Sequence, residues 1–161
     1  MNKTALSKGL FITYLLLLGI CIGVEISVGA LVAPVIFYPA SFLGNDVLTH
    51  FQSGILMTQI FLRFNMLLMF ITVFLFFCEV AGYFKGKGDL FSFILILIIL
   101  CCAILFVFYY TPFIVEAQSI GAKATLSEKF LSMHKASEVV LKVAIVMQIC
   151  LFFRKIFVEI K

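Results

Sequence analysis

Charge is scarce in this chain, because Asp, Glu, Lys and Arg together make up 12% of its 161 residues. Hydrophobic residues make up 64%, and the mean hydropathy is +1.22. A soluble domain cannot bury so much apolar surface, so the composition indicates a helical membrane protein. Trp is absent although there are 20 Phe, and therefore only Tyr can supply the aromatic belts at the membrane interfaces. The candidates are Tyr14, Tyr38, Tyr83, Tyr109 and Tyr110.

Paired cysteine motifs are also missing. None of the five cysteines belongs to a CxxC pair, and all of them fall inside or at the ends of apolar runs: Cys21, Cys78, Cys101, Cys102 and Cys150. We therefore expect small buried hydrophobes rather than disulfides or a thiolate metal site. The sequence contains no nucleotide-binding loop, no zincin motif and no nucleophile triad, so no common catalytic class is indicated.

Four apolar runs are long enough to cross a ~30 Å hydrocarbon core. They predict an all-α, four-transmembrane-helix bundle that forms one integral membrane domain over residues 1–161, with helices at about 10–38, 49–83, 90–116 and 127–153. Pro39 and Gly44-Asn45-Asp46 break the first run, and we expect Pro112 to kink the third. The segment 45–49 and Ser127-Glu128 supply plausible helix caps. The first run is too long for a signal peptide, so we expect it to be retained.

Basic residues predict the orientation. Seven Lys or Arg fall on one side of the predicted helices: Lys3, Lys8, Lys85, Lys87, Arg154, Lys155 and Lys161. Three fall on the other: Lys123, Lys129 and Lys135. By the positive-inside rule both termini of this multi-pass membrane protein are cytoplasmic. The net charge of +4 therefore comes from basic residues that orient the chain in the bilayer, not from a nucleic-acid-binding surface. The expected partners are lipid and other membrane subunits or copies of the chain.

Charged residues within the predicted helices suggest a polar site. Helical rise places Glu25, Arg63 and Glu138 each ~22 Å above the inner boundary, and Lys142 ~16 Å above it. Because isolated charges at membrane depth are costly, we expect these side chains to meet in the outer half of the bundle, with Glu25 and Arg63 as the central pair. His134 joins the site, since His134, Glu138 and Lys142 repeat at i, i+4 and i+8 on one helical face. The alternative is that these charges only fix the packing of the helices.

Smaller polar patterns accompany the charges. Thr58, Asn65 and Thr72 form a seam at heptad spacing on the second helix, whereas Gln52, Gln59 and Arg63 form another stripe. Gly19 and Gly23 form a GxxxG step on the first helix, which predicts close packing against a neighbouring helix.

The two histidines, His50 and His134, are the weak candidates for a metal site. Met57 and Met133 are suited to completing a copper site with them, since thioether and imidazole both bind that metal. The predicted heights of the two histidines differ by ~12 Å, so we expect no metal to be bound. We expect each histidine to bond a carboxylate or the backbone instead.

Three segments resemble a known family. Gly23–Phe37 (GVEISVGALVAPVIF) is similar to the first helix of the domain of unknown function 4149 family, itself similar to transmembrane protein 205. Ile60-Phe61-Leu62-Arg63-Phe64 resembles the Phe-x-Arg-aromatic signature of its second helix. Phe130–Ser137 (FLSMHKAS) resembles the Phe-x-x-x-His-x-x-Ser entry to its fourth.

The resemblance implies a four-helix inner-membrane protein and little about activity. It extends distantly to copper-resistance D-type proteins and to the J-type membrane protoporphyrinogen oxidase, which suggests haem or copper as ligands. However, this first helix has no His and the chain has no Trp, which argues against oxidase activity. Because the two histidines differ in height and no other strong ligand set exists, we predict that neither haem nor copper is bound. The leading hypothesis is binding or translocation of a small solute or ion. The alternatives are a haem- or copper-linked redox protein and an accessory subunit of a membrane complex.

Overall fold

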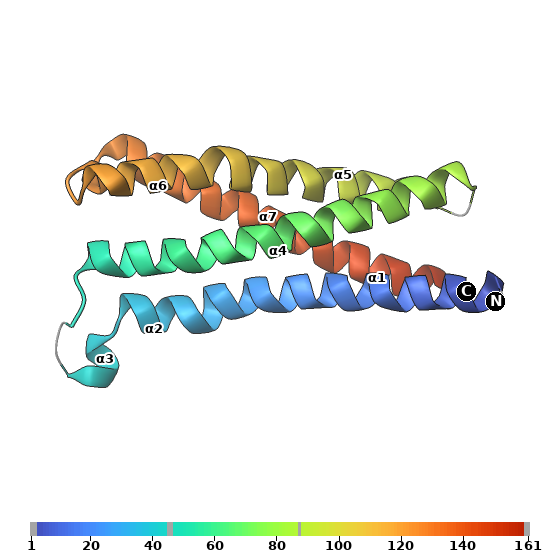
Figure 1. Ribbon diagram of the computed structural model, residues 1–161, viewed down its shortest axis with the longest axis horizontal. Helices are drawn as coiled ribbons and strands as arrows, with labels where there is room; N and C mark the ends of the chain where they lie inside the picture. Colours follow the sequence, from blue (N-terminus) through green and yellow to red (C-terminus); the bar gives the residue numbers. More distant parts are fainter. Residues whose placement is uncertain (1–2, 45–46, 87, 160–161) are drawn as a thin grey trace.

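The computed structural model describes residues 3–44, 47–86 and 88–159, and in these the chain is helical with short connections (Figure 1). Four helical segments are long and apolar enough to cross a membrane: Lys8–Phe37, His50–Phe84, Leu90–Ile120 and Glu128–Val158. The all-α, four-helix architecture expected from hydropathy is confirmed. Asn45, Asp46, Lys87 and Lys161, which entered the loop and orientation predictions, lie outside the described residues.

Two of the four segments, the first and the third, are divided by a π-helix. The first consists of α1 (Lys3–Ile26), a π-helix (Ser27–Val32) and α2 (Ala33–Phe37), and the short α3 (Ala40–Leu43) follows it. The second is the uninterrupted α4 (His50–Phe84). The third consists of α5 (Leu90–Leu105), a π-helix (Phe106–Tyr110) and α6 (Thr111–Ile120), so it continues beyond Glu116. A 3₁₀ turn (Ala124–Leu126) leads to α7 (Glu128–Glu159).

Three helices begin at side-chain caps. The Thr49 side chain accepts the Gln52 N–H, and the Gln52 side chain accepts the Thr49 N–H, which forms a complete capping box. Ser127 Oγ accepts the Phe130 N–H at the start of α7. Asp89 Oδ1 accepts the Ser92 N–H at the start of α5. These bonds satisfy backbone donors that have no partner within their own helix.

Each π-helix is followed closely by a proline, Pro34 in α2 and Pro112 in α6. Proline lacks an N–H and its ring clashes with the carbonyl four residues earlier, so the preceding turn widens instead of breaking. Where a kink was predicted at Pro112, the helix therefore continues from a widened turn into α6. The Thr111 hydroxyl donates to the Phe106 carbonyl oxygen at 2.8 Å, which satisfies an acceptor in this widened turn.

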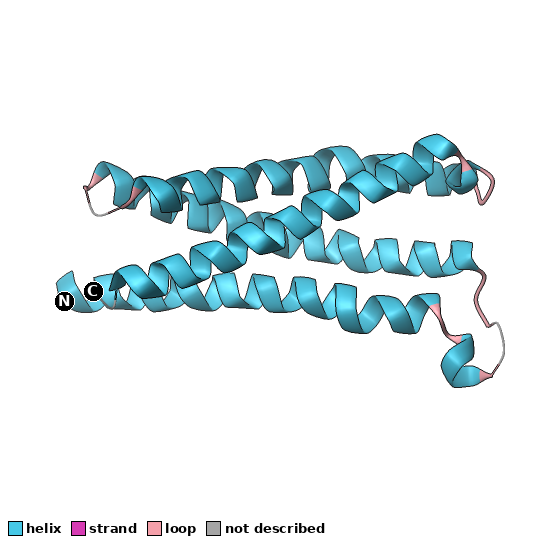
Figure 2. Cartoon of the chain, turned by 180° about the vertical axis from the view of Figure 1, so that it is seen from behind, coloured by secondary structure: helices cyan, strands magenta, loops and turns pink. Residues whose placement is uncertain are grey.

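The helices form a bundle in which α7 packs most extensively against α5, α5 packs against α4, and α1 contacts both α4 and α7. In Figure 1, α7 crosses behind α4 on its way to the C-terminus, so it lies near α6 at one end and near the start of α1 at the other. Figure 2 shows the same crossing from behind, with both termini at the same end. The core is apolar, and its most fully buried side chains include Leu18, Leu68, Ile71, Ile96 and Leu151.

The polar seam predicted on the second helix faces this core. Thr58, Asn65 and Thr72 are all buried on α4, and Glu79 continues the same heptad spacing by one more step. By contrast, Gln52, Gln59 and Arg63 are exposed. Of the two polar stripes on α4, the bundle buries only the first.

Candidate functional site

Glu25 lies in the buried seam of α1. The buried positions of this segment are Tyr14, Leu18, Cys21, Glu25 and Val28, and their alternating spacing of four and three residues defines one helical face. Glu25 is only 3% exposed. Measured along the helix axis, Glu25 lies ~18 Å from Phe37 and ~25 Å from Lys8. It is therefore nearer the membrane surface opposite the termini.

Among the residues that the structure describes, none donates a hydrogen bond to the carboxylate of Glu25. Both of its oxygens are fully buried and unbonded, as are both polar atoms of the Gln148 side chain on α7. The Gln148 amide faces the carboxylate closely enough to interact, but the two groups are not in hydrogen-bond geometry. The thiol of Cys21 lies beside both groups. Buried polar groups normally have partners, so this cluster of Cys21, Glu25 and Gln148 is the most unusual polar feature of the bundle.

The other residues predicted to surround Glu25 lie elsewhere. Arg63 is exposed, and its Nη1 donates to the Gln59 carbonyl oxygen of its own helix at 2.8 Å. Within the described parts of the chain no ion pair joins Glu25 to Arg63. The reason is helical phase: Arg63 immediately precedes the buried Phe64 and Asn65, and its side chain points away from the core. Its long stem allows the guanidinium to reach toward the membrane surface.

His134, Glu138 and Lys142 meet one another, but not Glu25. His134 Nε2 lies 3.4 Å from Glu138 Oε1, and Lys142 Nζ lies 3.4 Å from Glu138 Oε2. The side chains are 47%, 50% and 72% exposed, respectively. The predicted i, i+4, i+8 face is therefore present, but it lies on the surface of α7. Of the five residues expected to form one buried site, only Glu25 is buried.

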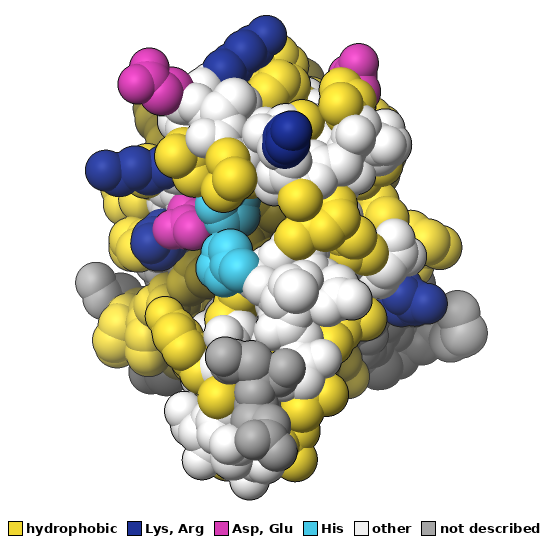
Figure 3. Space-filling view, turned by 90° about the vertical axis from the view of Figure 1, so that its left-hand side faces the viewer, with side chains coloured by type: hydrophobic (Ala, Val, Ile, Leu, Met, Phe, Trp, Pro, Cys, Tyr) yellow, Lys and Arg dark blue, Asp and Glu magenta, His cyan; other side chains and the backbone are white. Residues whose placement is uncertain are grey.

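The two histidines both appear on the end face of the molecule opposite the termini (Figure 3). His50 packs against the Phe37 ring, and His134 stacks on the Phe130 ring with a centroid distance of 5.9 Å. Among the residues that the structure describes, no three His, Cys, Asp or Glu side chains are grouped so as to hold a metal ion. The expected carboxylate neighbour is present at His134, as the 3.4 Å contact with Glu138.

A buried charge cluster that was not predicted from the sequence lies toward the terminal end of the bundle. Lys155 Nζ on α7 donates to Glu79 Oε2 on α4 at 2.7 Å, and the two side chains are 17% and 3% exposed. The Lys155 ammonium also lies 5.7 Å from the ring centroid of Tyr14 on α1. The Tyr14 hydroxyl is near the Glu79 carboxylate without a hydrogen bond of ordinary geometry. Three helices therefore meet at one ion pair.

Asp89 and Arg154 extend this cluster beyond the membrane span. Arg154 donates from Nε and Nη2 to Asp89 Oδ1, each at 3.3 Å. Partial burial works to raise the pKa of Asp89, but the hydrogen bonds from Ser92 and the charges of Arg154 and Lys155 outweigh it, so the pKa is lowered. The carboxylate thus stays ionised while it caps α5 and holds the end of α7.

The polar seam of α4 is tied to the third span by side-chain bonds. Asn65 Nδ2 donates to Thr111 Oγ1, and Gln118 Nε2 donates to Thr58 Oγ1, both at 3.0 Å. These pairs fix the register of α4 against α6.

A family model described as "Domain of unknown function (DUF4149)" matches residues 16–123. The chain belongs to this family. The DUF4149 match covers Cys21, Glu25 and Glu79 but ends before α7, so Gln148 and the resembling segment Phe130–Ser137 lie outside it. Neither the comparison with curated proteins nor that with solved structures gave a match.

The sequence carried partial signals for the residues that were missed. Glu79 follows Thr72 at the heptad spacing of the recognised seam, so extending that seam by one step finds it. Gln148 is an uncharged polar residue inside the apolar run of α7, seven residues from Leu141 and four from Ala144, and the burial of Ala144 fixes its face. An amide in an apolar run indicates a polar site less strongly than a charged group does, because burying an uncharged group costs less free energy.

Proposed function

We propose that this membrane protein binds a small cation, in the simplest case a proton, at Glu25. The observation that carries the proposal is the Glu25 carboxylate itself: within the described ranges of the chain its two buried oxygens accept no hydrogen bond, and they face a Gln148 amide that is equally without a partner there. An ionised carboxylate without a partner is costly inside a bundle, and a bound cation removes that cost. The Gln148 side chain supplies either an acceptor oxygen or a donor N–H to the bound state.

The surroundings favour binding over passage through the bundle. Between Glu25 and the charge cluster at Glu79 lies a layer of completely buried apolar side chains, including Leu18, Leu68 and Leu151. An ion that crosses this layer would lose all its polar partners. On the other side, the first span has only Val28 buried beyond Glu25, although Met57, Ala117 and Phe130 of the other spans are buried there as well. Because the distance along the helix from Glu25 to this end is the shorter one, ~18 Å against ~25 Å, we expect exchange from the end of the bundle opposite the termini.

The π-helix that begins two residues after Glu25 supports the same reading. π-turns occur frequently at functional sites because they change the direction of side chains within a helix. Here the turn widens the first span immediately beyond the carboxylate, in residues Ser27–Val32, where most side chains are exposed. The π-helix is a segment in which the backbone of the first span can change conformation when a cation binds at Glu25.

Carbodiimide labelling tests the proposal. N,N′-dicyclohexylcarbodiimide reacts with protonated carboxyl groups in apolar surroundings, so it should modify Glu25, and mass spectrometry of peptides should locate the adduct. Labelling should slow as pH rises. If Na⁺ also slows it relative to choline at equal ionic strength, the site accepts a metal cation as well as a proton.

Glu25→Gln should abolish this adduct, and Glu138→Gln serves as the matched control because Glu138 is half exposed. Gln148→Leu should alter the pH dependence of labelling without removing it. Absence of a Glu25 adduct at every pH, in protein shown to be folded by circular dichroism, would refute the proposal.

A further inference from the structure

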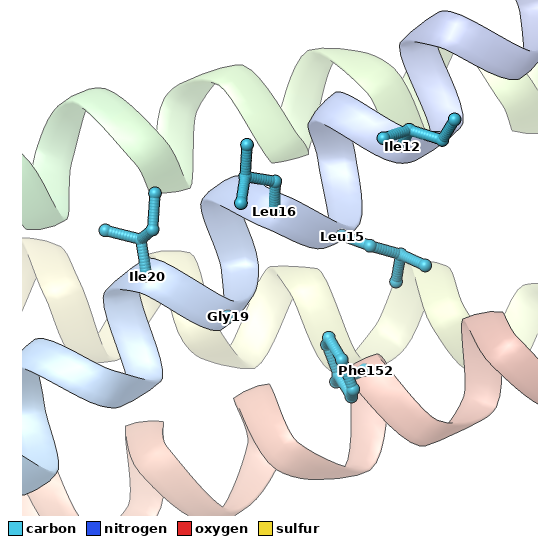
Figure 4. Close-up of a pocket in the computed structure, with 6 residues that line it drawn as sticks. All are labelled: Ile12, Leu15, Leu16, Gly19, Ile20 and Phe152. Carbon is cyan, nitrogen blue, oxygen red and sulfur yellow. The ribbon is translucent and has the colours of Figure 1, made fainter.

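A shallow apolar groove runs along the outside of the bundle between α1 and α7. Its lining consists of Ile12, Leu15, Leu16, Gly19, Ile20 and Phe152, and its volume is about 530 Å³ (Figure 4). In the close-up, Phe152 projects from α7 toward the α1 side chains. The groove lies on the opposite side of α1 from Cys21 and Glu25, which point into the bundle. It is therefore separate from the cation site.

The groove exists because Gly19 has no side chain where α7 approaches. A Cβ added at Gly19 would meet only the Phe152 ring, at 3.8 Å, and one added at Gly23 would meet nothing within 4 Å. The expectation that the GxxxG step packs tightly against another helix of the chain is therefore wrong. The surface at Gly19 is open to the membrane, and it is bounded by large side chains such as Leu16, which is 60% exposed.

Lys8 stands at the terminal end of this groove. It lies seven residues before Leu15 and eleven before Gly19, so the three positions fall almost in line along one face of α1. Lys8 is exposed and is the first residue of the membrane span. It takes part in no ion pair with the residues whose positions the structure describes. A free ammonium at the membrane boundary thus meets an apolar channel that leads into the membrane.

We propose that this groove binds an anionic phospholipid, with one acyl chain along Leu15, Gly19 and Phe152 and the phosphate at Lys8. The shape and charge match such a lipid at both ends: the lining is apolar, and Lys8, the charged side chain in line with it on the described part of α1, is positive and lies at headgroup depth. A basic residue at the surface contributes ~1 kcal/mol to attraction of anionic lipid. The volume falls in the ~300–1,000 Å³ range of small-molecule sites.

Native mass spectrometry of the full chain in a mild detergent tests this assignment, with phosphatidylglycerol and phosphatidylcholine added separately. We expect the wild-type protein to bind the first phosphatidylglycerol more tightly than the first phosphatidylcholine. Lys8→Gln should weaken phosphatidylglycerol binding about fivefold, the equivalent of ~1 kcal/mol, and leave phosphatidylcholine unchanged. Gly19→Leu fills the groove and should weaken both lipids.

Lys85→Gln is the matched control, because Lys85 lies at the same end of the bundle, after α4, and away from the groove. Equal losses in Lys8→Gln and Lys85→Gln would show general charge attraction and overturn the proposal. So would full lipid binding by Gly19→Leu in protein with wild-type circular dichroism. A dimer that replaces the lipid-bound monomer in the spectra would assign the groove to a second copy instead.

Discussion

Two buried glutamates in this bundle have opposite surroundings. Glu79 is 3% exposed and bonded to Lys155, whereas Glu25 is equally buried and accepts no hydrogen bond from any residue that the structure describes. The same side chain therefore ties helices together in one place and is the proposed cation ligand in the other. The difference comes from the neighbour on α7: residue 155 there carries an ammonium group, and residue 148 an amide.

The Glu79–Lys155 pair should show strong energetic coupling. Removing one partner strands a buried charge, which costs about 3–5 kcal/mol, so Glu79→Gln and Lys155→Met should each lower the free energy of unfolding clearly. The double substitution should cost much less than the sum, because it leaves no unpaired charge. Titration with sodium dodecyl sulfate, followed by circular dichroism, measures all four proteins.

Glu138 and Lys142 provide the control for this cycle. They also form an ion pair, but at 3.4 Å between two side chains that the bundle leaves exposed, so removing either one strands no charge inside the bundle and their coupling should be smaller. Coupling of similar size in both pairs would contradict the view that burial determines the strength of the Glu79–Lys155 contact.

Among the helices, the start of α5 combines a cap with an ion pair. Asp89 accepts the Ser92 N–H and also receives Arg154 from the end of α7. One side chain therefore both begins a helix and joins two spans. Gly88, directly before it, packs so closely on the end of α4 that an added Cβ would lie 2.7 Å from the Tyr83 nitrogen. Together these contacts hold the α4–α5 turn tightly.

The lowered pKa of Asp89 predicts a specific acid sensitivity. Its stabilising contribution is complete above its unfolded value of 3.8 and is lost as pH falls through the lower folded value. Asp89→Ala should cost ~1 kcal/mol at pH 7 through loss of the cap. Asp89→Asn keeps an acceptor oxygen for the cap but loses the charge, so its stability should change less than that of the wild type below about pH 4.

Thermal unfolding in detergent at pH 7, 4 and 3 compares these proteins. A wild type and an Asp89→Asn variant that lose stability in parallel over this range would show that the ion pair with Arg154 contributes nothing to the acid sensitivity.

On the scale of the whole molecule, both termini lie at one end of the bundle, with Lys8, Lys85 and Arg154 near that end. We expect this end to face the cytoplasm by the positive-inside rule. Cysteine labelling tests the orientation at two exposed positions that leave every basic residue intact, Phe84→Cys and Ala122→Cys, in a variant whose five native cysteines are replaced by Ala.

An impermeant maleimide should label Ala122→Cys in intact cells, and Phe84→Cys only after permeabilisation. Phe84 ends α4, and Ala122 lies in the connection before α7, at the opposite end of the bundle. The reverse pattern would invert the proposed orientation, and it would place the Glu25 entrance on the cytoplasmic side.

Local chemistry was sufficient for much of this architecture. Long apolar runs predicted four spanning helices because a bilayer leaves no other way to satisfy the backbone of such segments. Thr49 and Ser127 were recognised as caps, because a hydroxyl before an apolar run satisfies nearby N–H groups. The seam at Thr58, Asn65 and Thr72 was also found, since its spacing alone defines a face.

The partners of the charges depended on the tertiary structure. The membrane depth predicted from sequence position matched Glu25 with Arg63. However, depth does not determine which way a side chain points around the helix axis, and Arg63 faces outward. The crossing of α7 brings Gln148 to Glu25 and Lys155 to Glu79, residues that are more than 70 positions apart in the chain. The sequence determined which groups are costly in a membrane, and the packing of four helices decided which of them have a partner, because contacts between helices depend on phase and crossing as well as depth.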